Sequence, residues 1–216
     1  MVKLGKVLIL GDSYSTFEDE IPTGFDTWYY HDLKNDTDVA TSDQTWWKQL
    51  LACTDSELVL NSSWSGTTVC HTGYSGDCSD RSFISRFDKL VAEGFFAEHE
   101  VDTVFIFGGT NDNWNNSPLG DLKYADWQKE ELYSFLPAVC YLVNKVKTAL
   151  PHARVVYIIN IDLKPAIVKG IHAACDAFGA EIIQLQNIQT QSGHPNQTGM
   201  LQIKEQIVQY LERTNV

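Results

Sequence analysis

The chain has 216 residues, 44% of them hydrophobic, which suits one globular domain with a sizeable core and is too short for two ordinary α/β domains. Its formal net charge of -12 at pH 7 opposes binding to nucleic acid or to an anionic membrane surface. No apolar run approaches the roughly 20 residues of a membrane-spanning helix. We therefore expect a single domain over residues 1–216, with neither nucleic acid nor membrane as a partner.

The chain begins with an apolar stretch, MVKLGKVLIL, that itself has the pattern of a core strand. A signal peptide would need a longer apolar region and a small-residue cleavage site before that strand. We therefore expect a cytoplasmic protein, and a secreted protein whose signal peptide had been removed would begin in the same way.

Five cysteines occur, an odd number. Cys53, Cys140 and Cys175 lie in apolar surroundings, which is typical of buried free thiols. Cys70 and Cys78 flank a glycine-rich segment, and the sequence leaves open whether they form a disulfide. Since there is no C-x-x-C motif and no histidine at metal-site spacing, we expect no zinc site.

Five apolar runs have the length of buried strands and alternate with helical patterns. The strands are expected at residues 7–10, 58–60, 104–107, 155–161 and, with a weaker pattern, 181–185. The helices are expected at residues 45–52, 82–92, 136–146, 165–178 and 195–211, the last two with proline in the first turn. This alternation predicts an α/β fold, with a parallel sheet that carries helices on both faces.

Two long polar segments, residues 16–43 and 113–126, follow strand ends. In open α/β sheets the loops beyond the carboxyl ends of the strands build the site, so we expect both segments to contribute to it. The first segment carries a cluster of aromatic residues, Trp28, Tyr29 and Tyr30.

Two short motifs with candidate chemistry follow the first two strands. Gly11-Asp12-Ser13 comes directly after the first strand, where a serine on a tight turn can present its hydroxyl as a nucleophile. After the second strand, in NSSWSG, Gly66 can bring its backbone N–H close to a ligand without a side-chain clash. Each motif taken alone is equally typical of an ordinary turn.

Two further motifs come later in the chain. In GGTND, after the third strand, the Asn111 amide can donate a hydrogen bond to a developing oxyanion, although asparagine and aspartate also favour plain turns. In GHPN, His194 precedes the last helix on a loop that can face a cleft. We interpret the other five histidines as structural or exposed.

In this order the four motifs resemble the Ser, Gly, Asn and His blocks after which the SGNH hydrolases, or GDSL-like esterases, are named. The resemblance runs over residues 7–211, and its block residues are Ser13, Gly66, Asn111 and His194. It implies a flavodoxin-like three-layer α/β/α sandwich with a five-stranded parallel sheet. It also implies hydrolysis of carboxylic esters without a metal or an organic cofactor.

The resemblance assigns roles to these residues. Ser13 would be the nucleophile and His194 the general base. The oxyanion hole would consist of the backbone N–H groups of Ser13 and Gly66 and the side-chain amide of Asn111.

One position departs from the family pattern. The family usually has aspartate three residues before the histidine, where this chain has Gln191. Gln191 could accept the Nδ1–H of His194 but could not stabilise an imidazolium as a carboxylate does. We therefore expect a Ser-His dyad with a substitute acceptor, which could be Gln191, a backbone carbonyl or a carboxylate from another loop. Asp12 and Asp112 are expected to support the site by hydrogen-bonding to loop backbone.

Aromatic residues near the motifs suggest a substrate surface. Trp64, Trp114 and Tyr74 could stack on a sugar, although packing within the loops would also explain them. We expect a short-chain ester as substrate, such as an O-acetyl group on carbohydrate. The main alternative is a catalytically silent carbohydrate-binding protein, and a flavodoxin-like cofactor binder is disfavoured by the acidic Asp12 after the first strand. The oligomeric state stays open.

Overall fold

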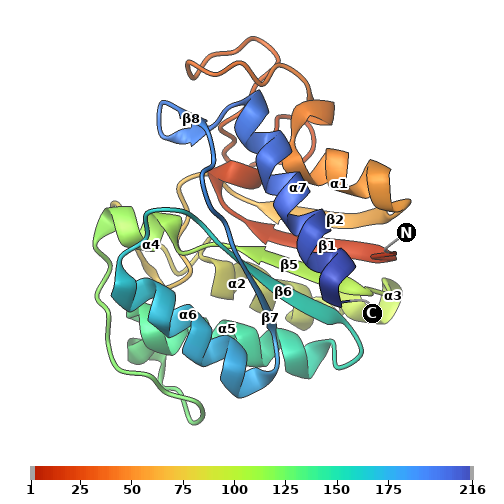
Figure 1. The fold of residues 1–216 in the computed structure, drawn as a ribbon. Coiled ribbons are helices and arrows are strands. Elements are labelled where there is room, and N and C mark those ends of the chain that lie inside the picture. Colours follow the sequence, from red (N-terminus) through yellow and green to blue (C-terminus); the bar gives the residue numbers. More distant parts are fainter. Residues whose placement is uncertain (1–2, 215–216) are drawn as a thin grey trace.

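A parallel five-stranded sheet with the order β2-β1-β5-β6-β7 runs through the centre of the structure (Figure 1). The structure is a computed structural model that describes residues 3–214, so the first two and last two residues of the expected domain lie outside it. The strands are β1 (Lys6–Gly11), β2 (Glu57–Ser63), β5 (Thr103–Phe107), β6 (Arg154–Ile159) and β7 (Glu181–Gln184). Each contains or overlaps one of the five predicted runs.

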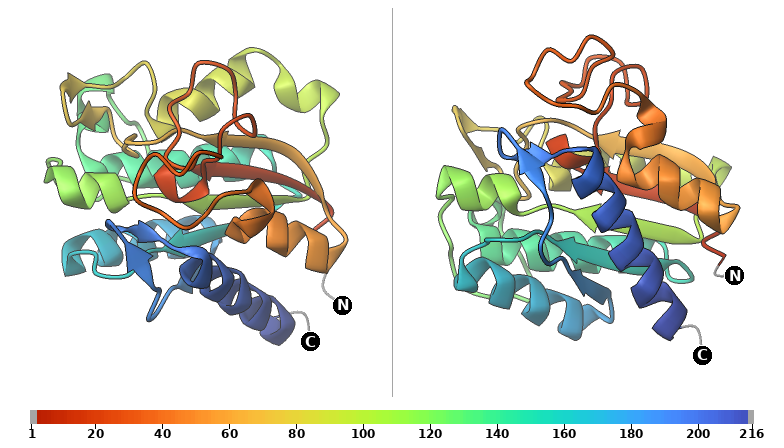
Figure 2. Two further views of the ribbon diagram at one scale, coloured as in Figure 1. Left: turned by 90° about the horizontal axis from the view of Figure 1, so that it is seen from above. Right: turned by 45° about the horizontal axis from the view of Figure 1, so that its top comes forward.

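Helices cover both faces of the sheet. On one face α1 (Trp46–Thr54) packs beside α7 (Gln197–Thr214), and on the other α5 (Phe135–Ala149) packs against both α2 (Phe83–Ala92) and α6 (Pro165–Phe178) (Figure 2). This arrangement confirms the predicted three-layer α/β/α fold with a five-stranded parallel sheet.

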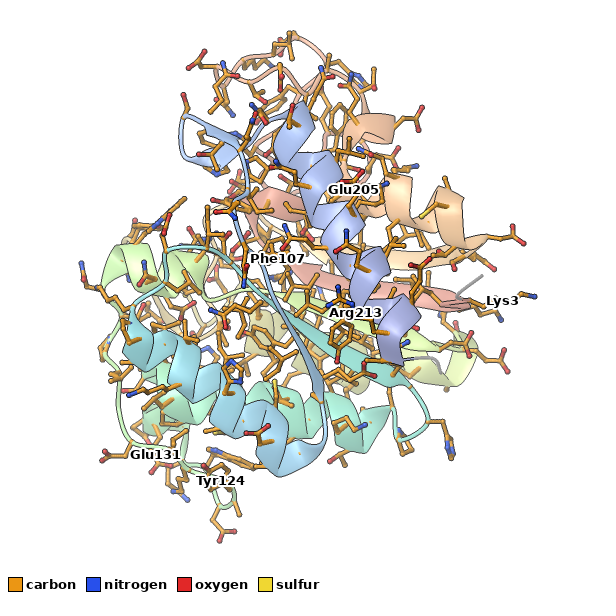
Figure 3. The ribbon with its side chains drawn as sticks, viewed as in Figure 1. Lys3, Phe107, Tyr124, Glu131, Glu205 and Arg213 are labelled. Carbon is orange, nitrogen blue, oxygen red and sulfur yellow. The ribbon has the colours of Figure 1, made fainter. Side chains whose placement is uncertain are left out.

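Strand β5 shows why the sheet is buried on both faces. Val104 and Ile106 belong to the core under α2, α5 and α6, whereas Phe105 and Phe107 belong to the core under α1 and α7. The alternation follows from the two-residue period of a strand. Phe107, at the carboxyl end of β5, lies near the middle of the molecule (Figure 3).

Most of the short elements lie at the sheet edge where the strands end. They are the 3-10 helices Ser13–Ser15, Ser42–Gln44 and Lys129–Tyr133, the helix α4 (Thr110–Asn115), and the hairpins β3 (Thr72–Gly73) with β4 (Gly76–Asp77) and β8 (Thr190–Gln191) with β9 (His194–Pro195). The helix α3 (Phe95–Glu98) lies at the opposite edge, before the start of β5 (Figure 1). Within residues 3–214, no helix is long and apolar enough to cross a membrane.

The expected start of the last helix is wrong by two residues. Pro165 is the first residue of α6 as predicted, but Pro195 lies in β9 and α7 begins at Gln197. The reason is a side-chain cap: Asn196 Oδ1 accepts a 2.8 Å hydrogen bond from the Gly199 N–H, as an N-cap asparagine does.

The cysteine predictions hold in part. All five thiols are free, including Cys70 and Cys78, and Cys140 and Cys175 are buried as expected. Cys53 is exposed, so its predicted burial is wrong, because the buried side chains of α1 lie at positions such as Leu50 and Thr54 and leave Cys53 on the solvent side.

Candidate active site

The nucleophile candidate sits at the end of β1 on a tight turn that its neighbours fix. The Asp12 carboxylate accepts a 3.1 Å hydrogen bond from the Tyr14 N–H and so caps the 3-10 helix that begins at Ser13. Gly11 is required by close packing, because a Cβ there would lie 2.4 Å from Ser63 Oγ on the neighbouring strand. The turn therefore holds Ser13 at the carboxyl edge of the sheet.

Ser13 and His194 meet across this edge. Ser13 Oγ lies 2.8 Å from His194 Nε2, although 181 positions separate the two residues in the chain. Both are nearly covered, with 3% of Ser13 and 6% of His194 exposed. The two residues are thus within the hydrogen-bond distance that a nucleophile and its general base require.

A tight hairpin turn sets the histidine tautomer. Ser192 and Gly193, the two residues between the paired Gln191 and His194, both have positive φ angles of 50° and 78°, as in a type I′ turn. This turn brings the Ser192 carbonyl to 3.2 Å from His194 Nδ1. Because a carbonyl can only accept, the ring proton lies on Nδ1, and Nε2 is free to accept the proton of the Ser13 hydroxyl.

The Gln191 side chain does not act as the partner of His194. Its amide donates a 3.0 Å hydrogen bond to Asp36, and the Ser192 hydroxyl donates a 2.6 Å bond to the other oxygen of the same carboxylate. These two bonds lower the pKa of Asp36. Of the three acceptors considered from the sequence, the backbone carbonyl is the one in place, because the loop carboxylate of Asp36 bonds to the side chains of Gln191 and Ser192 rather than to His194.

Side chains from the segment after β1 contact the histidine hairpin at several points. The hydroxyl of Tyr14 donates to the Gly193 carbonyl and that of Tyr29 to the Pro195 carbonyl, both at 2.7 Å. Trp28 stacks face to face on His194, with ring centroids 3.6 Å apart and planes at 10°. In the sequence Trp28 was noted only as part of an aromatic cluster, and nothing in the polar pattern of residues 16–43 indicated Asp36 or the contact of Trp28 with His194.

Burial controls the protonation of His194. It lowers the pKa of the imidazole to about 4, while the hydrogen bond to the Ser192 carbonyl acts in the opposite direction. The ring is therefore neutral at neutral pH, which is the state that a general base needs.

Gly66 and Asn111 lie on segments that are tied together. The Trp64 N–H donates to the Gly11 carbonyl at 3.2 Å, and the Asn111 amide donates to the Thr67 carbonyl at 2.9 Å, so the loop that carries Gly66 is fixed on both sides. Gly66 is exposed with a φ of 74°, and a Cβ added there would meet no atom within 4 Å, so the backbone conformation explains the glycine.

Asn111 begins a helix rather than a plain turn. It is the second residue of α4, and its carbonyl oxygen Oδ1 accepts a 3.0 Å hydrogen bond from the Tyr74 hydroxyl. With Nδ2 on the Thr67 carbonyl and Oδ1 on Tyr74, the amide is held at both ends. One N–H of Nδ2 remains for another acceptor.

Asp112 ties the same helix to the loop after β2. Its carboxylate accepts hydrogen bonds of 2.8 Å and 3.2 Å from the N–H groups of Val69 and Cys70. Burial raises the pKa of Asp112 to about 6. These contacts are with loop backbone, like the contact of Asp12.

A buried arginine that was not predicted from the sequence lies beneath the site. The Arg86 guanidinium donates to the carbonyls of Gly11 and Ser62 and, at 3.1 Å, to Thr67 Oγ1. Burial lowers the pKa of Arg86 to about 9 and raises that of the nearby Asp12 to about 7. A charged residue on the apolar stripe of α2 was the signal that could have revealed it.

The three aromatic candidates for substrate contact differ in position. Trp114 and Tyr74 are 44% and 54% exposed and lie at the rim of the site, because Trp114 packs edge-on against His194 and Tyr74 bonds to Asn111. Trp64 instead stacks on a neighbouring phenylalanine of the loop after β1, with centroids 4.2 Å apart.

Comparisons with known proteins place the chain in a family. The GDSL-like lipase/acylhydrolase family model matches residues 5–211. The chain is similar to putative GDSL-like lipases from Bacteroides ovatus (42% identity, TM-score 0.91, 98% of this chain and 99% of that chain) and Bacteroides uniformis (39%, 0.89, 97% and 96%). A family two carbohydrate esterase from Cellvibrio japonicus shares the fold at 16% identity, with a TM-score of 0.66 over 98% of this chain and 63% of that chain.

A search of the curated proteins gives no match. The family model and the two Bacteroides structures cover nearly the whole chain, and Ser13, Gly66, Asn111 and His194 occur within the matched residues. The chain belongs to the GDSL-like lipase/acylhydrolase family and is an ester hydrolase.

Proposed function

We propose that this protein is a serine esterase that removes short acyl groups through a Ser13–His194 dyad, and that O-acetyl groups on carbohydrate are its substrates. The observation that carries the proposal is the 2.8 Å contact between Ser13 Oγ and His194 Nε2, with Nδ1 of the same ring held by the Ser192 carbonyl. This contact orients a neutral base toward the hydroxyl that it must deprotonate.

In the proposed reaction, Ser13 Oγ attacks the ester carbonyl carbon while its proton moves to His194 Nε2. The oxyanion that forms accepts hydrogen bonds from the backbone N–H groups of Ser13 and Gly66 and from the Asn111 amide. The imidazolium then protonates the departing alcohol. The acyl group remains bound to Ser13 Oγ. A water molecule repeats these steps, with His194 as base, to release the acid and restore the serine.

The covering of the dyad favours a small acyl group. Ser13 and His194 are almost fully buried, and the rings of Tyr14, Trp28 and Trp114 all lie against His194. The exposed faces of Trp114 and Tyr74 at the rim suit the C–H surfaces of a sugar, on which aromatic side chains stack.

A substrate panel tests the proposal. p-Nitrophenyl esters of increasing acyl length are compared with acetylated xylan, which is included because an acetyl xylan esterase from Butyrivibrio proteoclasticus shares the fold (16% identity, TM-score 0.63). We expect kcat/KM to be highest for acetate and to fall with acyl length, and we expect acetate release from the xylan. Inactivity on every short-chain ester, together with binding of the carbohydrate, would favour the silent binding protein instead.

A further inference from the structure

The proposed reaction places a positive charge on His194, and no carboxylate among residues 3–214 is hydrogen-bonded to the imidazole to stabilise that charge. The only hydrogen-bond partner of Nδ1 among the described residues is the Ser192 carbonyl, a neutral dipole. The carboxylate that would usually accept this proton is absent, and the Gln191 amide is turned to Asp36. The imidazolium therefore needs another source of stabilisation.

No charged group in the described chain takes that role by direct contact. On the hairpin side, Asp36 is bound to the side chains of Gln191 and Ser192, and on the β1 side Asp12 is bound to the Tyr14 N–H. The Tyr14 ring packs against His194, but its hydroxyl donates to a backbone carbonyl.

Of the three aromatic rings in the described chain that contact His194, that of Trp28 lies nearest to the imidazole. The ring centroids are 3.6 Å apart and the planes are at 10°, so the two rings overlap almost fully. Two neutral aromatic rings disfavour such a sandwich, because the negative faces of their π systems meet. A cationic ring over the indole face is attracted, and tryptophan is the best partner for such a contact.

The position of Trp28 is set through its backbone. Its N–H donates to Thr16 Oγ1 at 2.9 Å, and its carbonyl accepts a 2.8 Å bond from the Asn35 amide. The indole N–H is buried with no partner among residues 3–214, so no polar bond of the ring itself explains where the ring lies. The ring packs against the core under α1 and α7, and it makes its face-to-face contact with His194.

We propose that Trp28 replaces the absent carboxylate as a positioning residue: its indole face stabilises the imidazolium form of His194 and keeps Nε2 directed at Ser13 Oγ. The inference rests on the proposed function and adds to it a specific group that acts on the base. Because the imidazolium exists only once the Ser13 proton has been transferred, the effect belongs to kcat rather than to KM.

Two variants separate this role from mere packing. Trp28→Phe keeps an aromatic face, and Trp28→Leu keeps apolar cover without one. We expect Trp28→Leu to lower kcat by about 10- to 30-fold, equal to about 1.4–2 kcal/mol, with KM nearly unchanged, and Trp28→Phe to stay within about threefold of the wild type. A rise in KM at constant kcat in Trp28→Leu would show that Trp28 contacts the substrate instead, and would overturn the inference.

A direct titration provides the second readout. Methylboronic acid forms a bond between boron and Ser13 Oγ, and the serine proton passes to His194 Nε2, which reproduces the ion pair without turnover. In this adduct the pKa of His194 is followed by NMR, with the signal assigned by its loss in His194→Ala. We expect the pKa to be about 1 unit lower in Trp28→Leu and nearly unchanged in Trp28→Phe. Trp114→Leu, which removes an edge-on ring, is the matched control and should leave this pKa nearly unchanged.

The sign of the shift decides the outcome. If Trp28 only excludes water, Trp28→Leu admits water and the pKa of His194 rises, because hydration favours the charged form. An unchanged or raised pKa in Trp28→Leu would therefore overturn the inference while the boronate adduct leaves the proposed function intact. Failure of the wild type to form the adduct, together with no ester hydrolysis, would overturn the proposed function and this inference with it.

Discussion

Asp36 and Ser192 are joined by a 2.6 Å hydrogen bond although 156 positions separate them in the chain. The Ser192 hydroxyl is the donor, and the Ser192 carbonyl in turn accepts the Nδ1–H of His194. The Asp36 carboxylate is thus linked to the proposed base only indirectly. It binds the hydroxyl of Ser192, and the carbonyl of the same residue binds His194. Because Ser192 has a φ of 50°, which is costly for a residue other than glycine, the bond also holds a strained turn in place.

Asp36→Ala should therefore lower kcat by about tenfold, because it releases the turn that positions the Ser192 carbonyl. Gln191→Ala should cost less than about threefold, since the Gln191 side chain bonds to Asp36 and not to His194. Asp36→Asn, which keeps an oxygen acceptor for Ser192, is the matched control and should recover most of the activity. Steady-state kinetics on an acetyl ester measures all three, and a Gln191→Ala variant as inactive as His194→Ala would contradict this view.

The pH dependence of kcat/KM should show a single acid limb with a midpoint near pH 4. The base must be neutral, so activity rises with pH through the pKa of His194, which burial lowers to about 4, and then stays constant to neutral pH. A pH profile measured over the range in which the protein stays folded tests this. A midpoint near 6.5, the ordinary value for histidine, would mean that the imidazole is solvated in the working enzyme.

Asn111→Ala should lower kcat by about 10²–10³ with little change in KM, because an oxyanion donor acts mainly in the transition state. Tyr74→Phe should lower kcat by a smaller factor, about three- to tenfold, since it frees Oδ1 of Asn111 and leaves Nδ2 on the Thr67 carbonyl. The comparison of kcat with KM for both variants is decisive. A large rise in KM at constant kcat would make Asn111 a substrate-binding group.

Arg86→Met should lower the free energy of unfolding by about 2–4 kcal/mol, because it leaves buried acceptors at the ends of β1 and β2 with fewer donors. Arg81→Met is the matched control: its guanidinium pairs with Asp80 at the surface, and the loss should be below about 1 kcal/mol. Urea unfolding of the two variants gives the comparison. Equal effects would show that the buried guanidinium contributes no more than a surface one.

The strands and most helices could be predicted because burial leaves a clear pattern in the sequence. The run over residues 104–107 is apolar throughout, since β5 is covered on both faces, and Pro165 marks the start of α6. The motifs of Ser13, Gly66 and Asn111 could be placed at one edge because each follows a strand and parallel strands end there together. The start of α7 was predicted wrongly at Pro195, because that proline belongs to a hairpin and the capping Asn196 sets the start of the helix.

The groups around His194 could not be predicted in the same way. Trp28 and Asp36 lie in an irregular polar segment, where no periodicity relates a residue to its neighbours in space. Their contacts with the histidine hairpin join residues more than 150 positions apart, and only the folded chain brings them together. The Ser192-Gly193 dipeptide was a readable turn signal, and it would have indicated the hairpin that supplies the carbonyl.

The most direct test of the account is covalent labelling of Ser13 combined with turnover of an acetyl ester. The wild type should hydrolyse p-nitrophenyl acetate and lose that activity as a fluorophosphonate attaches to Ser13, identified by mass spectrometry of the labelled peptide. Ser13→Ala should neither label nor hydrolyse the ester, and its melting temperature should stay close to that of the wild type. Retained turnover in Ser13→Ala, or labelling at another residue, would contradict the assignment of Ser13 as the nucleophile.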